Sequence, residues 1–108
     1  MPDKFIVVLI TAPTPQVGEQ IATALVEERL AACVNILPDV SSVYAWKGDV
    51  HKNQEVLLVV KTREQLFRDH LVPAVQAVHP YEVPEIIALP IVMGLGGYLD
   101  WIQDETSA

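Results

Sequence analysis

Two continuous apolar runs stand out along the chain and predict strands at the centre of a sheet. They are Phe5–Ile10 and Val56–Val60, both rich in β-branched residues and typical of strands covered on both faces. Three further pieces complete the strand pattern: Ala32–Leu37, Val40–Trp46 and Ile86–Val92. A Pro-Asp pair separates the first two pieces and a proline interrupts the third. Because proline lacks a backbone donor, these pieces predict edge strands or a bulge.

Helical periodicity occupies the stretches between these strands. Val17, Ile21 and Leu25 recur at one-turn spacing among polar residues, which predicts an amphipathic helix ending near Leu30. The same spacing returns from Arg63 and predicts a second helix that ends near His79, with a kink where a proline removes a backbone donor. A short third helix is expected around residues 98–102, after a glycine-rich segment.

The resulting order, strand-helix-strand-strand-helix-strand, predicts an α+β fold of the ferredoxin-like type, a split β-α-β sandwich. All 108 residues fit one domain. A turn signal at Lys47-Gly48-Asp49 joins two strands into a hairpin longer than a domain of this size needs. Free strand edges, together with Tyr44 and Trp46 near the hairpin tip, predict that this hairpin packs against other copies of the chain.

Charge and composition narrow the range of partners. Seven Lys and Arg against 14 Asp and Glu give a net charge of -7, which disfavours a nucleic-acid partner. The apolar runs are too short to span a membrane. A single cysteine, Cys33, fits a reducing, cytoplasmic location and is expected in the core. No nucleophile or phosphate-loop motif is present, so no enzyme is predicted.

The segment His79–Glu85 is the strongest candidate for a site, because two prolines brace an imidazole, a phenol and two carboxylates. Imidazole nitrogen and carboxylate oxygen suit Cu(II), Zn(II) or Ni(II), so His79, Glu82 and Glu85 are the candidate metal ligands. The alternative is a helix-to-strand connection in which His79 ends the helix and Tyr81 packs.

Several stretches of the chain closely resemble the CutA family of divalent-cation tolerance proteins. They are Leu9–Pro13, Glu27–Asn35, His79–Ile86 and Tyr98–Ile102, together with the strand Glu55–Thr62. The resemblance implies a ferredoxin-like protomer, a homotrimer reminiscent of the PII signal-transduction proteins, and a role in copper or divalent-cation tolerance. No cofactor is required for this role, although Cu(II) or another divalent cation is a possible ligand.

The chain departs from the family's proposed copper motif at two of three positions. That motif has a cysteine before Thr-Ala-Pro and two histidines before Pro-Tyr, whereas this chain has Ile10 and Val78 and retains only His79.

The alternative to a metal site is a PII-like sensor or scaffold. Its clefts between subunits would bind a small ligand or a partner protein, and the predicted lining residues are Tyr44, Trp46, Lys61, Tyr81 and Glu82. Lys61, at the end of a central strand, either contacts an anion there or marks the exit to solvent.

Overall fold

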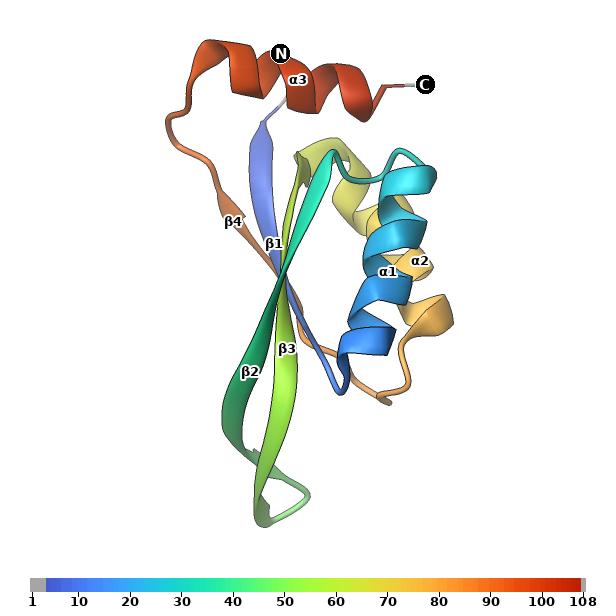
Figure 1. Cartoon of the computed structure of the whole chain (residues 1–108), viewed down its shortest axis with the longest axis vertical. Coiled ribbons are helices and arrows are strands. Elements are labelled where there is room, and N and C mark those ends of the chain that lie inside the picture. Colours follow the sequence, from blue (N-terminus) through green and yellow to red (C-terminus); the bar gives the residue numbers. More distant parts are fainter. Residues whose placement is uncertain (1–3, 108) are drawn as a thin grey trace.

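A four-stranded antiparallel sheet organises the computed structural model, which describes residues 4–107. The strands are β1 (Phe5–Ala12), β2 (Cys33–Trp46), β3 (Asp49–Arg63) and β4 (Ile86–Pro90). Their order across the sheet is β2-β3-β1-β4, so the two uninterrupted apolar runs are central and the two proline-bearing strands are the edges (Figure 1). The ferredoxin-like fold predicted from the element order is confirmed.

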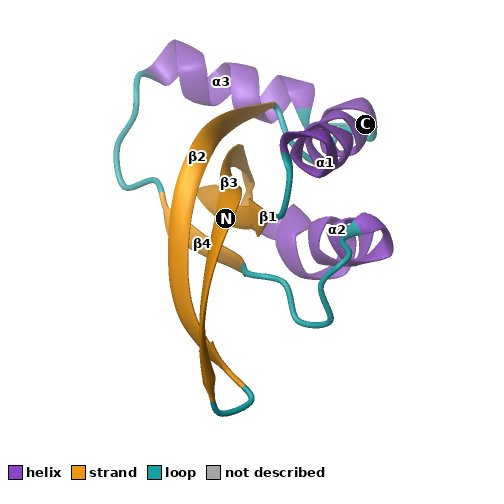
Figure 2. Ribbon diagram, turned by 60° about the horizontal axis from the view of Figure 1, so that its bottom comes forward, coloured by secondary structure: helices purple, strands orange, loops and turns teal. Residues whose placement is uncertain are grey.

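Two helices pack together on one face of this sheet (Figures 1 and 2). They are α1 (Pro15–Glu27) and α2 (Val72–Val78). The third helix, α3 (Gly96–Glu105), lies across the end of the sheet where β1 begins and β3 ends (Figure 1). None of the helices in the described part of the chain combines the length and the apolar character needed to cross a membrane.

The core lies between the sheet and helices α1 and α2. Every second residue of β1, from Ile6 to Ala12, is buried against these helices, and alternate residues of β3 follow the same pattern. The opposite face is only partly buried in a single chain, and Ile87 and Leu89 of β4 are exposed there. The prediction that the central strands are covered on both faces is therefore wrong for one chain alone, because both α1 and α2 lie on the same side.

The second helical region begins later than predicted. Arg63 is the last residue of β3 and is buried, donating from Nη2 to the Thr106 carbonyl oxygen at 2.8 Å and from Nε to the Thr106 hydroxyl at 2.7 Å. A 3-10 turn, Glu64–Leu66, and a π-helical turn, Phe67–Leu71, precede α2. The helical region is irregular next to its proline, as predicted, because Pro73 stands in the first turn of α2, directly after the π-helical turn.

The β2–β3 hairpin extends well beyond the helices (Figure 1) and accounts for much of the 44 Å long axis. Its register shifts between Leu37 and Val40, and Asp39 has a φ of 60°, so the predicted bulge is confirmed. At the tip Lys47 and Gly48 both have positive φ, as a tight two-residue hairpin turn requires.

Two features at the edges of the sheet, the end of β4 and the burial of Cys33, differ from those predicted. β4 ends at Pro90, two residues earlier than expected from the sequence. Cys33, at the start of β2, is only partly buried, so its prediction as a core residue is wrong.

Candidate functional site

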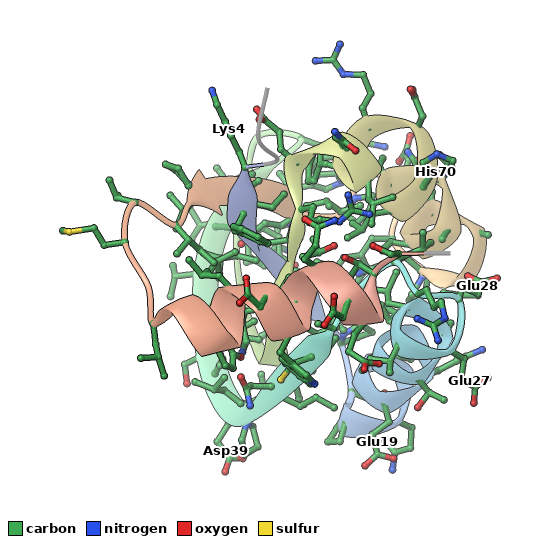
Figure 3. All side chains as sticks on the ribbon, turned by 90° about the horizontal axis from the view of Figure 1, so that it is seen from above. Lys4, Glu19, Glu27, Glu28, Asp39 and His70 are labelled. Carbon is green, nitrogen blue, oxygen red and sulfur yellow. The ribbon has the colours of Figure 1, made fainter. Side chains whose placement is uncertain are left out.

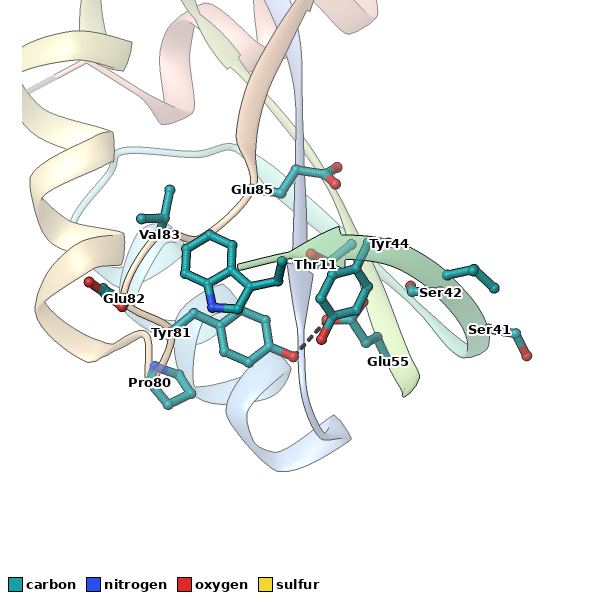
Figure 4. Close-up of a pocket in the computed structure, with 12 residues that line it drawn as sticks. Thr11, Ser41, Ser42, Tyr44, Glu55, Pro80, Tyr81, Glu82, Val83 and Glu85 are labelled. Atoms are coloured by element: carbon teal, nitrogen blue, oxygen red, sulfur yellow. Dashed lines mark hydrogen bonds between the residues drawn. The ribbon is translucent and has the colours of Figure 1, made fainter. Parts of the chain in front are cut away.

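A cleft of about 700 Å³ opens between the hairpin and the loop that joins α2 to β4. The lining residues of the hairpin come from the half of the hairpin that contains the turn. The lining residues of the loop come from the segment that directly follows His79. Its lining combines aromatic rings, carboxylates and hydroxyls with the aliphatic side chains of Val43, Pro80 and Val83 (Figure 4). The volume is within the range of ~300–1,000 Å³ usual for small-molecule sites.

A buried carboxylate lies in the wall of this cleft. Glu55 on β3 is only 7% exposed, and its Oε2 accepts a hydrogen bond of 2.7 Å from the hydroxyl of Tyr81 (Figure 4). Among the hydrogen bonds of residues 4–107, this is the only one made by the Glu55 side chain. The pKa of Tyr81 is raised, first by burial of the phenol and then by its hydrogen bond to Glu55 and that group's charge. Tyr81 therefore stays protonated and remains a donor through the neutral range.

Tyr44 is held on the same wall by its cross-strand neighbours. Its hydroxyl accepts a hydrogen bond from the Asn53 amide, and its ring stacks on that of His51, with centroids 5.5 Å apart. Both contacts come from β3, the strand that also carries Glu55. The register of the hairpin thus fixes the position of Tyr44 relative to the buried carboxylate.

Trp46 lies at the mouth of the cleft, where it meets a cation from the hairpin turn. The Lys47 ammonium is 5.6 Å from the centre of the indole ring, and it also lies 3.7 Å from Oε2 of Glu82 on the facing loop. Both charged side chains are more than two-thirds exposed, so this ion pair contributes little to stability. It nonetheless connects the hairpin tip to the loop.

His79 positions the loop through both of its ring nitrogens. The imidazole is 8% exposed. Nδ1 accepts a hydrogen bond from the Tyr81 backbone N–H at 3.2 Å, so Nε2 carries the proton and donates to the Thr11 carbonyl oxygen at 2.8 Å. The ring also packs on Tyr81, with centroids 4.8 Å apart. A metal ion would have to displace one of these two hydrogen bonds before the imidazole became a ligand.

The structure brings most of the predicted site residues together. Tyr44, Trp46, Tyr81, Glu82 and Glu85 all line the cleft, whereas His79 lies directly behind it. Within residues 4–107, no three His, Cys, Asp or Glu side chains are grouped closely enough to hold a metal ion.

Lys61 is not brought to the cleft within one chain. It lies six residues beyond Glu55 on β3, about 20 Å along the strand at ~3.3 Å per residue. Its ammonium group donates instead to the Asn35 side-chain oxygen of β2. Near this end of the sheet the pKa of Tyr98 is raised, chiefly by burial and then by Cys33.

Glu55 and Thr11 are among the cleft residues that sequence reasoning missed, and the others are Ser41, Ser42 and Val43 on β2. The one available signal was the position of Glu55, a charged residue directly before the apolar run Val56–Val60. A charged residue at that position usually marks the solvent end of a strand. Its burial depends on Tyr81, which is 26 residues away along the chain.

Comparison with known proteins gives consistent matches over nearly the whole chain. The model of the family described as CutA1 divalent ion tolerance protein matches residues 6–105. The "Divalent-cation tolerance protein CutA" of Thermus thermophilus is 56% identical over 100 residues, covering 93% of this chain and 96% of that protein. The chloroplastic CutA protein of Arabidopsis thaliana is 48% identical, covering 94% of this chain but 55% of that protein. The chain thus spans about half the length of the plant relative.

A solved structure confirms that the similarity extends to the fold. The divalent cation tolerance protein from Thermus thermophilus superimposes with a TM-score of 0.92 at 54% sequence identity. The alignment covers 95% of this chain and 99% of that one.

Proposed function

Because this chain belongs to the CutA1 divalent ion tolerance protein family, we propose that it acts in divalent-cation tolerance as a binding protein rather than an enzyme. The ligand site of this function is the cleft between the hairpin and the loop after His79. The observation that carries the proposal is the lining, in which Tyr44, Trp46 and Tyr81 meet Glu55 in a volume of about 700 Å³. Convergent polar groups in an apolar pocket of this size are typical of small-ligand sites.

A growth assay tests whether tolerance depends on the cleft. In a bacterial host that lacks its own family member, we expect the wild-type chain to restore growth in rising Cu(II), and Trp46→Leu to fail. Trp101→Leu is the matched control, because Trp101 on α3 is 40% exposed and Trp46 is 39% exposed. Circular dichroism would confirm that both variants fold. Equal growth with the two variants would contradict a role for the cleft.

Direct metal binding is the second candidate, and the position of Glu82 and Glu85 on the cleft favours it. With His79 they offer carboxylate and imidazole ligands suited to Cu(II) or another divalent cation, with no resident cofactor needed. Binding would require His79 to give up a hydrogen bond to Thr11 or Tyr81. Further ligands would come from water or from a second copy of the chain.

Calorimetric titration of chelator-stripped protein with Cu(II) and Zn(II) tests this candidate. Saturable binding tighter than about 1 μM, near -8 kcal/mol, should disappear in His79→Ala and persist in His70→Ala. His70 is the matched control, because it is an exposed histidine in the helical region. Weak binding that neither substitution alters would exclude ligation by His79.

A homotrimer, which the family resemblance implied, is the assembly that we propose. Its support is the apolar surface that one chain leaves open: Ile87 and Leu89 on β4, followed by Val92 and Met93, are all exposed. Exposed apolar patches beside free strand edges are typical of subunit interfaces. Light scattering should give three times the chain mass of 11.9 kDa, and a monomer would contradict the proposal.

A cytoplasmic location also remains our proposal. The half-buried thiol of Cys33 has no cysteine partner in the chain, which favours a reducing compartment. Fractionation of cells that express the protein would test this location directly.

A further inference from the structure

The buried carboxylate of Glu55 has no cationic partner in the described part of the chain. Its only side-chain hydrogen bond there is the one from Tyr81, which occupies Oε2. Among residues 4–107 the ion pair formed is that of Lys47 and Glu82 at the cleft mouth. A carboxylate that is more than nine-tenths buried is costly to keep charged unless a cation or further donors compensate it. Glu55 therefore favours a positively charged occupant of the cleft.

The other lining residues favour the same kind of occupant. None of the side chains that line the cleft is a lysine, arginine or histidine, whereas Glu55, Glu82 and Glu85 are all acidic. The chain as a whole carries a net charge of -7, which adds a long-range attraction for cations. An anionic ligand would therefore meet three acidic side chains in the lining, and the ammonium group of Lys47 at the cleft mouth is already paired with Glu82.

The aromatic rings indicate what kind of cation fits. The cleft mouth already holds one ammonium group, that of Lys47, between the face of Trp46 and the carboxylate of Glu82. Elsewhere in the lining Tyr44 and Tyr81 lie beside Glu55 in a similar combination of rings and carboxylate (Figure 4), but no ammonium group of the described chain is part of the lining. Aromatic faces attract alkylated ammonium ions strongly, because such ions are weakly hydrated.

We propose that this cleft binds a small organic ammonium ion, with its charge between the Glu55 carboxylate and the rings of Tyr44 and Tyr81. The inference rests on the proposed function only in taking the cleft as the ligand site. The volume of about 700 Å³ exceeds what a bare metal ion needs and suits a ligand with an alkylated head and a short polar tail. The hydroxyls of Ser42 and Thr11, also in the lining, would meet that tail.

The test compares a charged probe with its neutral isostere. Choline and 3,3-dimethylbutan-1-ol have the same shape, but only choline carries a charge. Both are titrated into the full-length protein by calorimetry, with EDTA present throughout so that metal ions do not contribute. We expect choline to bind at least about tenfold more tightly, the factor that corresponds to ~1.4 kcal/mol of cation recognition.

Two variants identify the groups responsible. Glu55→Gln keeps an oxygen that accepts from Tyr81 but removes the charge, so choline affinity should fall by about tenfold while the neutral probe is unaffected. Glu19→Gln is the control, since Glu19 is exposed on α1 (Figure 3) and does not line the cleft. It removes the same charge and should leave both affinities unchanged.

Each result decides the inference separately from the proposed function. Equal binding of the two probes, lost in Trp46→Leu, would overturn the ammonium proposal and retain the cleft as a ligand site. If Glu55→Gln and Glu19→Gln weakened choline binding equally, the proposal would also be overturned, because the affinity would then depend only on the net charge of the protein. Absence of choline binding up to millimolar concentration would refute it as well. The growth assay with Trp46→Leu would still test, independently, whether tolerance depends on the cleft.

Discussion

The hydrogen bond between Tyr81 and Glu55 should contribute measurably to stability, because it is the only side-chain bond that Glu55 makes within residues 4–107. In Tyr81→Phe the ring still packs against His79, but the donor is lost. Glu55, a residue that is 7% exposed, would then have no hydrogen-bond donor to its side chain from the described part of the chain. Burying an unsatisfied charged acceptor is more costly than losing an exposed hydrogen bond.

The magnitude follows from the nature and exposure of the two groups. Hydrogen bonds to charged groups contribute about 1.5–3 kcal/mol. Tyr81 is only partly buried, and water that reaches the cleft can replace part of the lost bond. We therefore expect Tyr81→Phe to lower the free energy of unfolding by about 1.5 kcal/mol, the lower end of that range.

Urea denaturation at constant chain concentration measures this change, and a double-mutant cycle with Glu55→Gln isolates the pair. Constant concentration matters because dissociation of an oligomer would contribute to the midpoint. Tyr44→Phe is the control, since its hydroxyl accepts only from an exposed amide, that of Asn53, and it should cost less than about 0.5 kcal/mol. A Tyr81→Phe change within that limit, with no coupling to Glu55, would refute the reasoning.

Three further predictions concern pH and packing. Because the pKa of Tyr81 is raised in the folded chain, its contribution to the free energy of unfolding is complete below the unfolded-state pKa of ~10 and is lost as the pH rises above that value. Between neutral and alkaline pH, Tyr81→Phe should therefore lose less stability than the wild-type protein. Gly18→Ala places a methyl group 2.9 Å from a β3 side chain and should cost about 1–2 kcal/mol in urea, whereas Gly96→Ala, with open space around it, should not destabilise. Thr106→Val removes the hydroxyl that accepts from buried Arg63 and should lower the thermal midpoint by about 4–8 °C per kcal/mol lost; an unchanged midpoint would contradict it.

The arrangement of strands was predictable because the sequence marks it locally. Two of the strands contain a proline and the two β-branched runs do not. Proline is excluded from central strands because it has no backbone N–H to donate to a neighbouring strand. The order β2-β3-β1-β4 follows from that difference together with the sequence of elements. The local pattern could not show which face of the sheet is covered. Both helices lie on one side, and apolar residues of the other face, such as Leu89, are exposed in one chain.

The cleft was predictable in part, for a related reason. Tyr44 and Trp46 alternate along one strand, and Tyr81 stands in a proline-braced loop, so each was a visible candidate on its own. The function of His79 and the burial of Glu55 depend on contacts between segments far apart in the chain. The Thr11 carbonyl oxygen at the end of β1 accepts a hydrogen bond from His79 Nε2, and no spacing rule links residues 11 and 79. In one chain Lys61 lies at the opposite end of β3 from the cleft, so its predicted place in a cleft between subunits stays a prediction.

The position of the cleft connects ligand binding to assembly. The hairpin alternates along β2, so that Tyr44 and Trp46 line the cleft while the intervening Ala45 points to the opposite face. Val43 and Val50, whose cross-strand partners are Lys52 and Ala45, are both exposed on this hairpin, which extends beyond the helices (Figure 1). A ligand that orders the aromatic residues would therefore also restrict the apolar residues that a second copy would contact. Because coupling between two sites is reciprocal, a ligand that tightens the proposed trimer must itself bind more tightly to trimer than to monomer, and dilution should weaken its affinity.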